Sequence, residues 1–195
     1  MMKNKKHVLL CILGRTSCGK DTLVNKLCER TGLTAIISYT TRPRRNGEGD
    51  THIFSTREEY EKIRADGNVA AYTEIAGNIY WTTIEQLYEH SVYIIDYKGI
   101  ETLRQLNLPN LRLVTIFINT PDDIRKERAL NKRGDDRLTF MKRDMAEREQ
   151  FRGMLRNADF DYAISNIDVA KAYSVLRWIS QIEGTWKNNI EEEIE

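Results

Sequence analysis

Proline and cysteine are both scarce in this chain, whose 195 residues include three of each. So few prolines, with no stretch rich in serine, glycine and proline, exclude a long flexible linker, and the length fits one domain with a full core. The cysteines Cys11, Cys18 and Cys28 lie close together near the N-terminus. An odd, clustered set with no later partner excludes a disulfide framework and indicates reduced thiols in a cytoplasmic protein. The spacing of the cysteines does not match a zinc site.

Long hydrophobic runs and an excess of one charge are also missing. The longest apolar runs are about as long as a strand, so we expect no membrane span. The basic residues at 1–6 lead directly into an apolar segment without a small-residue cleavage site, so we expect no signal peptide. The net charge is +1, which does not favour nucleic acid as a partner.

A loop with two glycines follows the first apolar segment, at residues 8–13. Its nine residues are Gly14-Arg15-Thr16-Ser17-Cys18-Gly19-Lys20-Asp21-Thr22, and a helical pattern begins behind them. The order strand, glycine loop, helix is the context of a phosphate-binding loop. The glycines let the backbone curl so that amides point at an anion, and Lys20 can reach the terminal phosphates of a nucleotide. We predict that these nine residues bind nucleotide phosphates; the alternative is a glycine turn that precedes a helix by chance.

Asp21 departs from the usual loop pattern. The residue after the lysine is commonly Ser or Thr, whose hydroxyl binds Mg²⁺. Aspartate is a hard oxygen donor that can bind the same cation directly or through water. Because its charge would otherwise repel phosphates, we predict that Asp21 lies beside a magnesium ion.

Apolar segments of strand length alternate with helical patterns along most of the chain. The expected strands are 8–13, 35–37, 92–95, 113–118 and 162–164. The expected helices are 21–30, 100–106, 121–131, 138–156 and 168–183. Continuous apolar runs are typical of parallel strands that are buried on both faces. The alternation predicts a doubly wound α/β sheet, which binds nucleotides at the carboxyl ends of its strands.

Residues 38–90 interrupt this alternation. They are polar and turn-rich, with a helical pattern at 57–65 and two short alternating segments at 69–75 and 78–82. This predicts a small antiparallel lobe inserted into a core formed by residues 1–37 and 91–195. Several aromatic residues are expected to pack in the core or at its margin: Tyr72, Tyr88, Tyr93 and Trp178.

Arginines are concentrated in two places. Pro43 fixes the backbone between Arg42 and Arg45, so that the two guanidinium groups could converge on one phosphate. Between residues 125 and 156, eleven Lys or Arg outnumber six Asp or Glu. A basic surface loop and a solvated helix face are the alternative interpretations. The phosphate-binding loop earlier in the chain favours phosphate contacts for some of these arginines.

Together these motifs resemble the guanylate kinase family of nucleoside monophosphate kinases, over nearly the whole chain. Beyond the phosphate loop, the segments that carry the resemblance are Ser38 to Glu48, Phe54 to Tyr60, Gly77 to Thr82, Ile94 to Gly99, Lys132 to Gly134, Lys142-Arg143 and Phe160 to Asn166. The resemblance implies a P-loop NTPase fold with a monophosphate-binding lobe at 38–90 and a lid at 132–155. It also implies ATP and Mg²⁺, phosphorylation of GMP or dGMP, and a monomer or homodimer without nucleic acid or membrane as partner.

The resemblance assigns roles on the donor side of the reaction. Lys20 would bind the β- and γ-phosphates of ATP together with the loop amides. Arg133 and Arg143 would close over the transferred phosphoryl group, and both are predicted catalytic residues with Lys20 and Arg42. Arg128 is a weaker candidate because it is out of register by one residue.

On the acceptor side, the resemblance implies that Arg42, Arg45 and Tyr80 hold the phosphate of the monophosphate. The residues implied to face the base are Ser38, Thr82 and Asp96. Asp96 is also implied to contact a water on the metal.

One departure from the family concerns the acceptor phosphate, because the segment Gly49 to Phe54 is shorter and lacks the family's Tyr there. The other departures concern the base. Ala71 stands where the family has a Glu that reads guanine, and Ile94 replaces the first Asp of an Asp-x-Asp pair. Losing a carboxylate lowers discrimination between bases. The alternatives are therefore another acceptor, either a different nucleotide or a phosphorylated sugar. A non-catalytic phosphopeptide-binding domain is a third alternative, which the intact Gly14, Gly19 and Lys20 disfavour.

Overall fold

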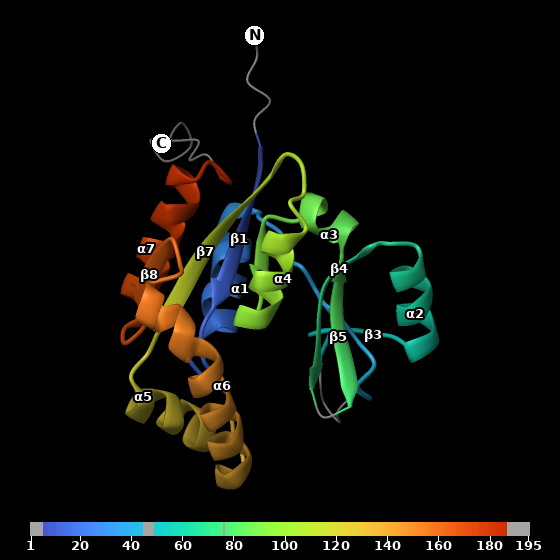
Figure 1. The fold of residues 1–195 in the computed structure, drawn as a ribbon. Coiled ribbons are helices and arrows are strands. Elements are labelled where there is room, and N and C mark those ends of the chain that lie inside the picture. The colour runs from blue at the N-terminus through green and yellow to red at the C-terminus, as the bar shows by residue number, and fades with distance from the viewer. Residues whose placement is uncertain (1–5, 45–48, 76, 187–195) are drawn as a thin grey trace.

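The computed structural model describes residues 6–44, 49–75 and 77–186. It contains a parallel core sheet and a smaller mixed sheet to one side of it (Figure 1). This arrangement confirms the predicted α/β class.

The core sheet has four parallel strands in the order β6-β1-β7-β8. Their bounds are β1 (His7–Leu13), β6 (Val92–Ile94), β7 (Leu111–Asn119) and β8 (Tyr162–Ser165). β1 pairs with β6 on one side and with β7 on the other. Its residues 9–13 have no exposed surface. The continuous apolar run at this strand therefore reflects burial on both faces.

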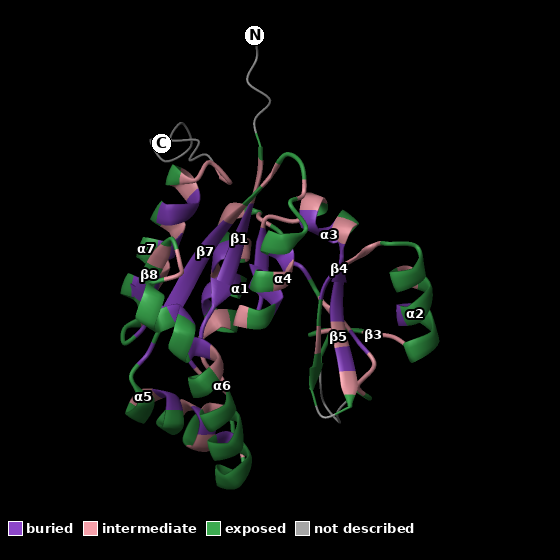
Figure 2. Ribbon diagram, viewed as in Figure 1, coloured by how far each residue is buried: buried purple, intermediate pink, exposed green. Residues whose placement is uncertain are grey.

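Helices cover both faces of the core sheet. One face carries α1 (Lys20–Thr31) and α7 (Val169–Ile182), which pack on Leu10 and Ile12 of β1. The other face carries α3 (Ile84–Glu89), α4 (Tyr97–Gln105) and the end of α6 (Arg137–Asn157), which pack on Leu9, Cys11 and Leu13. Figure 2 shows the buried residues concentrated on β1 and β7, between these two layers.

The smaller sheet has the strand order β3-β2-β5-β4. Its strands are β2 (Tyr39–Thr40), β3 (Ile53–Phe54), β4 (Val69–Ile75) and β5 (Asn78–Thr83), and α2 (Arg57–Ala65) packs beside it. β4 and β5 form the expected antiparallel hairpin, whereas β3 runs parallel to β2. The helix begins at Thr56, whose side chain forms a reciprocal capping box with Glu59. The rings of Tyr60 and Trp81 meet edge to face across the interface between helix and sheet.

Three expectations differ from the structure. Residues 35–37 form only a single parallel bridge, Ala35 to Val92, because Ile37 turns to solvent and is 42% exposed. The helix expected at 121–131 is divided into α5 (Asp122–Glu127) and a π-helical turn, η1 (Arg128–Lys132). Trp178 is 61% exposed on α7 and Tyr72 is 46% exposed on β4, so neither packs in the core. The predicted bounds of the lobe and of the lid stay predictions.

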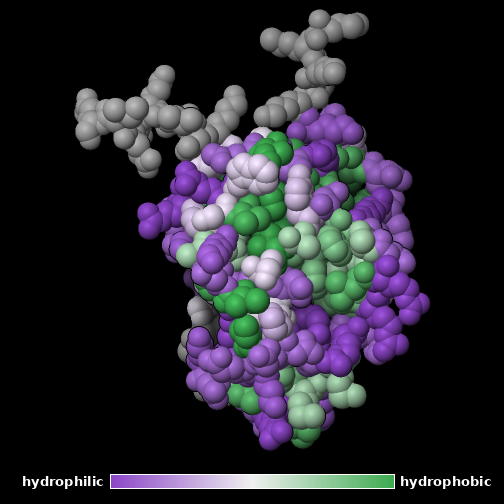
Figure 3. Space-filling model, turned by 90° about the vertical axis from the view of Figure 1, so that its left-hand side faces the viewer, coloured by the Kyte–Doolittle hydropathy of each residue, from purple (hydrophilic) through white to green (hydrophobic). Residues whose placement is uncertain are grey.

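No helix in the described ranges is long and apolar enough to cross a membrane. Exposed apolar side chains occur on the outer faces of α6 and α7, at Leu138, Met141, Met145, Val175, Trp178 and Ile182. Figure 3 shows apolar patches on that side of the molecule, interrupted by hydrophilic side chains.

Candidate active site

The loop between β1 and α1 requires glycine at two positions. Gly14 has φ +153°, and a Cβ there would lie 2.6 Å from the Cys18 sulfur and 2.8 Å from the Ile118 carbonyl oxygen. Gly19 has φ +92°, and a Cβ there would lie 2.5 Å from Asn166 Nδ2. Both positions combine a left-handed backbone with close packing. The predicted loop is thus built into the end of the core sheet.

The carbonyl group of Cys18 anchors the loop. It accepts hydrogen bonds from Asn166 Nδ2 at 2.7 Å, Thr120 Oγ1 at 3.0 Å and an Arg128 guanidinium nitrogen at 3.3 Å. Thr120 follows β7 and Asn166 follows β8, so the ends of two core strands hold the loop. Within the described residues no side chain caps the N-terminus of α1, which leaves its first amides for an anion.

A cavity of about 510 Å³ opens beside the loop. Lys20 lines it and donates from Nζ to the Gly14 carbonyl oxygen at 2.6 Å. The predicted loop residues in its lining are Ser17, Gly19, Lys20, Asp21 and Thr22, and the lid side contributes Arg128, Lys132 and Arg133. Four cationic side chains and one carboxylate make this cavity suitable for a polyphosphate.

The outer part of the loop faces α5 and α6 instead of this cavity. Arg15 donates to Asp122 at 3.0 Å and to Asp144 at 2.6 Å. The backbone N–H of Thr16 donates to Glu147 at 2.5 Å. Arg15 and Thr16 thus contact carboxylates in this structure, and their predicted contact with nucleotide stays a prediction.

Arg125 lies beneath these contacts and is 1% exposed. It donates to the Thr16 carbonyl oxygen at 3.1 Å and pairs with Asp122 and Asp144, both at 2.7 Å. These hydrogen bonds raise the pKa of Arg125 although burial opposes its charge. The hydrogen bond from Arg125 also holds the pKa of Asp122 below its usual value.

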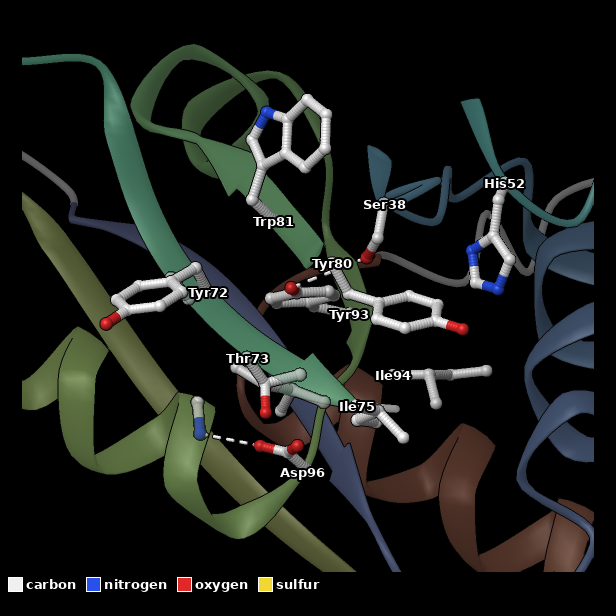
Figure 4. A pocket seen from close by; sticks show the side chains of 13 residues that line it. Ser38, His52, Tyr72, Thr73, Ile75, Tyr80, Trp81, Tyr93, Ile94 and Asp96 are labelled. Carbon is white, nitrogen blue, oxygen red and sulfur yellow. Dashed lines mark hydrogen bonds between the residues drawn. The ribbon is translucent and has the colours of Figure 1, made fainter. Parts of the chain in front are cut away.

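A second cavity, of about 160 Å³, lies between the core sheet and the lobe (Figure 4). Of the predicted acceptor residues, Ser38, Tyr80 and Asp96 line it. Asp96 caps α4 by accepting a hydrogen bond from the Gly99 N–H at 2.6 Å, which fixes its carboxylate. Ser38 donates to the hydroxyl of Tyr93 at 3.5 Å. The structure therefore brings these three predicted residues together in one cavity.

Arg42 and Thr82, two other predicted acceptor residues, lie elsewhere. Arg42 donates to the Pro43 carbonyl oxygen at 2.8 Å, and its guanidinium lies 5.5 Å from the centre of the Phe54 ring. Thr82 has no exposed surface and donates to Gln86 at 3.2 Å. Arg45 lies outside the described residues. The roles predicted for these residues stay predictions.

The two predicted lid arginines differ in their surroundings. Arg133 lines the cavity beside the loop. It forms a two-point ion pair with Asp135, and this hydrogen bonding raises the pKa of Arg133. Arg143 is exposed on α6. It is not among the described residues that line the two cavities.

Sequence reasoning missed four residues that build the site. Thr120 and Asn166 hold the loop, and their position directly after two parallel strands could have indicated this. His52 and Tyr93 line the second cavity, between the core sheet and the lobe. No short motif contains them, because Tyr93 reaches the cavity from β6 and His52 from the bend before β3.

The residues present fit a nucleotide with Mg²⁺. Ser17 Oγ is buried without a hydrogen-bond partner in the part of the chain that is described, and a phosphate oxygen would supply one. In the same ranges no group of three or more His, Cys, Asp or Glu could hold a metal alone. Asp21 and Asp96 are single carboxylates, which suits Mg²⁺ because it binds through one or two carboxylates and the substrate phosphates.

Comparison with known proteins points to guanylate kinases. A family profile described as guanylate kinase matches residues 6–182. The chain belongs to the guanylate kinase family. The guanylate kinase of Protochlamydia amoebophila is 35% identical over 189 residues, which cover 91% of each chain. That of Vibrio parahaemolyticus is 31% identical, covering 91% of this chain and 89% of its own.

A solved structure agrees with this assignment. The crystal structure of guanylate kinase from Anaplasma phagocytophilum has a TM-score of 0.63 at 25% identity, over 92% of this chain and 87% of that chain. Membership of the guanylate kinase family confirms the P-loop fold and the class of nucleoside monophosphate kinases. The comparisons do not favour the phosphorylated-sugar and phosphopeptide alternatives.

Proposed function

We propose that this guanylate kinase family member transfers the γ-phosphoryl group of ATP to GMP or dGMP. The observation that carries the proposal is the placement of the two cavities. Gly14 follows β1 and Asp96 follows β6, which are neighbouring parallel strands. Ile12 pairs with Ile94, and Gly14 and Asp96 each lie two residues beyond this pair. A donor at the loop and an acceptor at Asp96 would therefore lie side by side.

On the donor side, Lys20 and the amides at the start of α1 would hold the phosphates of ATP, with Asp21 next to Mg²⁺. The metal would supply charge neutralisation on the phosphates. Arg133 and Arg143 would contact the phosphoryl group in transit, which requires Arg133 to exchange Asp135 for phosphate oxygens. An arginine in this role contributes about 10³-fold or more to the rate.

On the acceptor side, Arg42, Arg45 and Tyr80 would hold the phosphate of the monophosphate. The residues proposed to face the base or its surrounding water are Ser38, Thr82 and Asp96. Closure of the lobe and the lid would exclude water, so that the phosphoryl group reaches the nucleotide instead of being hydrolysed. The three cysteines are free, which supports the cytoplasmic location proposed from the sequence. Whether the protein is a monomer or a homodimer stays a prediction.

A coupled assay with ATP, Mg²⁺ and a panel of monophosphates tests this function. We expect GMP and dGMP to be phosphorylated well above AMP, CMP and UMP. We expect Lys20→Ala to lower kcat/KM by about 10²-fold or more, because it removes a charge that stabilises the transferred phosphoryl. Lys62→Ala on α2 is the matched control, since Lys62 is exposed on the lobe. No turnover of GMP together with turnover of another acceptor would refute the proposal.

A further inference from the structure

We propose that Asp144 and Glu147 dock helix α6 on the phosphate-binding loop and thereby position Arg143 for phosphoryl transfer. Neither carboxylate needs to touch a substrate, so both are positioning residues that act through Arg143. This inference rests on the proposed function and deepens it, because it assigns the geometry of the lid to contacts at the base of α6.

Two contacts one helical turn apart join α6 to the loop. Asp144 lies 2.6 Å from Arg15, and its side chain is 15% exposed. Glu147 accepts the hydrogen bond from the Thr16 N–H at 2.5 Å. Arg15 and Thr16 are the second and third residues of the loop, directly behind β1. The helix is therefore fixed to the part of the loop between Gly14, which follows β1, and Cys18, which Thr120 and Asn166 hold.

A buried cation strengthens this attachment. Arg125 pairs with Asp144 at 2.7 Å and donates to the Thr16 carbonyl oxygen at 3.1 Å, so one guanidinium holds both helix and loop. Asp122 pairs with Arg125 and with Arg15 from the other side. Charge pairs inside a protein are strengthened by the low dielectric, and losing one partner is far more harmful than at the surface. The position of α6 against the loop is thus set firmly.

The same helix face carries Arg143. Residues four apart on a helix lie on one face, so Arg143 lies one turn before Glu147, and it is exposed in this structure. Arg143 also directly precedes Asp144 in the docked turn. The hydrogen bond to Asp135 raises the pKa of Arg133, and the charges of Asp21 and Glu147 add to this effect. Arg133 also lines the cavity beside the loop together with Asp21 and Lys20. Docking α6 therefore sets where both lid arginines stand relative to Asp21 and Lys20.

The alternative is that these ion pairs stabilise the fold and have no effect on the reaction. Asp144→Asn and Glu147→Gln test this, because each removes a charge and keeps the size of the side chain. We expect kcat for GMP to fall about 10- to 100-fold, the range for a misplacement near 1 Å. KM for GMP should stay within about two-fold, because none of the described residues that line the acceptor cavity belongs to α6. Glu149→Gln is the matched control: Glu149 is exposed on α6, pairs with Arg152, and should leave kcat unchanged.

A double-mutant cycle with Arg143→Lys separates positioning from stability. If Asp144 acts through Arg143, the double variant should keep the kcat of Arg143→Lys alone, within about two-fold. Losses that multiply would overturn the inference, and so would an unchanged kcat in both single variants. If Asp144→Asn unfolds, Glu147→Gln carries the same cycle, because it leaves the pairs of Arg125 intact. A wild-type protein without GMP turnover would instead refute the proposed function.

Discussion

Replacing Gly14 by alanine is expected to destabilise the whole domain, not only the nucleotide site. The new Cβ would lie 2.8 Å from the Ile118 carbonyl oxygen and 2.6 Å from the Cys18 sulfur. The sulfur can turn aside, but Ile118 belongs to β7 and pairs with Ile164 of β8. Relief of the contact therefore requires a shift of the central strands.

The size of the effect follows from two contributions. A non-glycine residue held at an unfavourable φ costs about 1–3 kcal/mol, and overpacking a close-packed site costs about 1–3 kcal/mol more. A value of about 4 kcal/mol is a large part of the usual 5–15 kcal/mol stability of a domain. For a chain of this length it corresponds to a fall in Tm of about 8–16 °C.

Thermal unfolding followed by circular dichroism measures this directly. Gly32→Ala is the matched control, because Gly32 has φ +71° at the end of α1 but nothing within 4 Å of its new Cβ. Gly32→Ala should therefore be destabilised only by the unfavourable φ, which costs about 1 kcal/mol. If Gly14→Ala lowered Tm no more than Gly32→Ala does, the contact with Ile118 would not be the constraint described above.

Three further outcomes are expected. Gly153→Ala should raise the free energy of unfolding by about 0.5–1 kcal/mol in urea titrations, because Gly153 lies inside α6 with open space at its Cβ; a loss would contradict this. A hydrogen bond from Arg104 holds the pKa of Asp159 below its usual 3.8, so its stabilising effect is present above pH 3.8 and lost as the pH falls further. Asp159→Asn should therefore weaken the acid dependence of Tm in that range. Burial raises the pKa of the Cys11 thiol, so iodoacetamide should modify Cys11 only after unfolding, as peptide mass mapping would detect.

The core of the fold could be predicted because its signal is local. Residues 8–13 and 113–118 are continuously apolar, and the structure places β1 and β7 there. Residues 35–37 have a similar composition but form only the Ala35–Val92 bridge. Three residues are too few to define a strand, and the pairing depends on a partner more than fifty positions away.

The irregular helix after β7 illustrates a second limit. The pattern at 121–131 is helical, and helical turns do form there. The π turn begins at Arg128, whose guanidinium donates to the carbonyl oxygens of Cys18 and Asn166. Those acceptors are distant in the sequence. The local pattern of apolar residues therefore could not predict that the helix widens into a π turn at Arg128.

In the candidate site, too, local features could be predicted from the sequence and contacts between distant residues could not. The nine residues of the loop are contiguous, so a short motif predicted a loop between a strand and a helix, and the structure has it between β1 and α1. The contacts of Arg15 with Asp122 and Asp144 join positions more than a hundred residues apart, and the sequence showed only a basic run with some acidic residues. A pattern of charges cannot indicate which of them pair.

The three hydrogen bonds to the Cys18 carbonyl group have a consequence for how ATP is captured. A binding loop that neighbouring strands already hold in place loses little conformational entropy when a ligand binds, because the loop was ordered during folding. Under the proposed function, the encounter would then be governed by diffusion and by the attraction between Lys20 and the phosphates. Damage at the ends of β7 or β8 would loosen the receptor and slow that capture, although neither strand would touch the nucleotide.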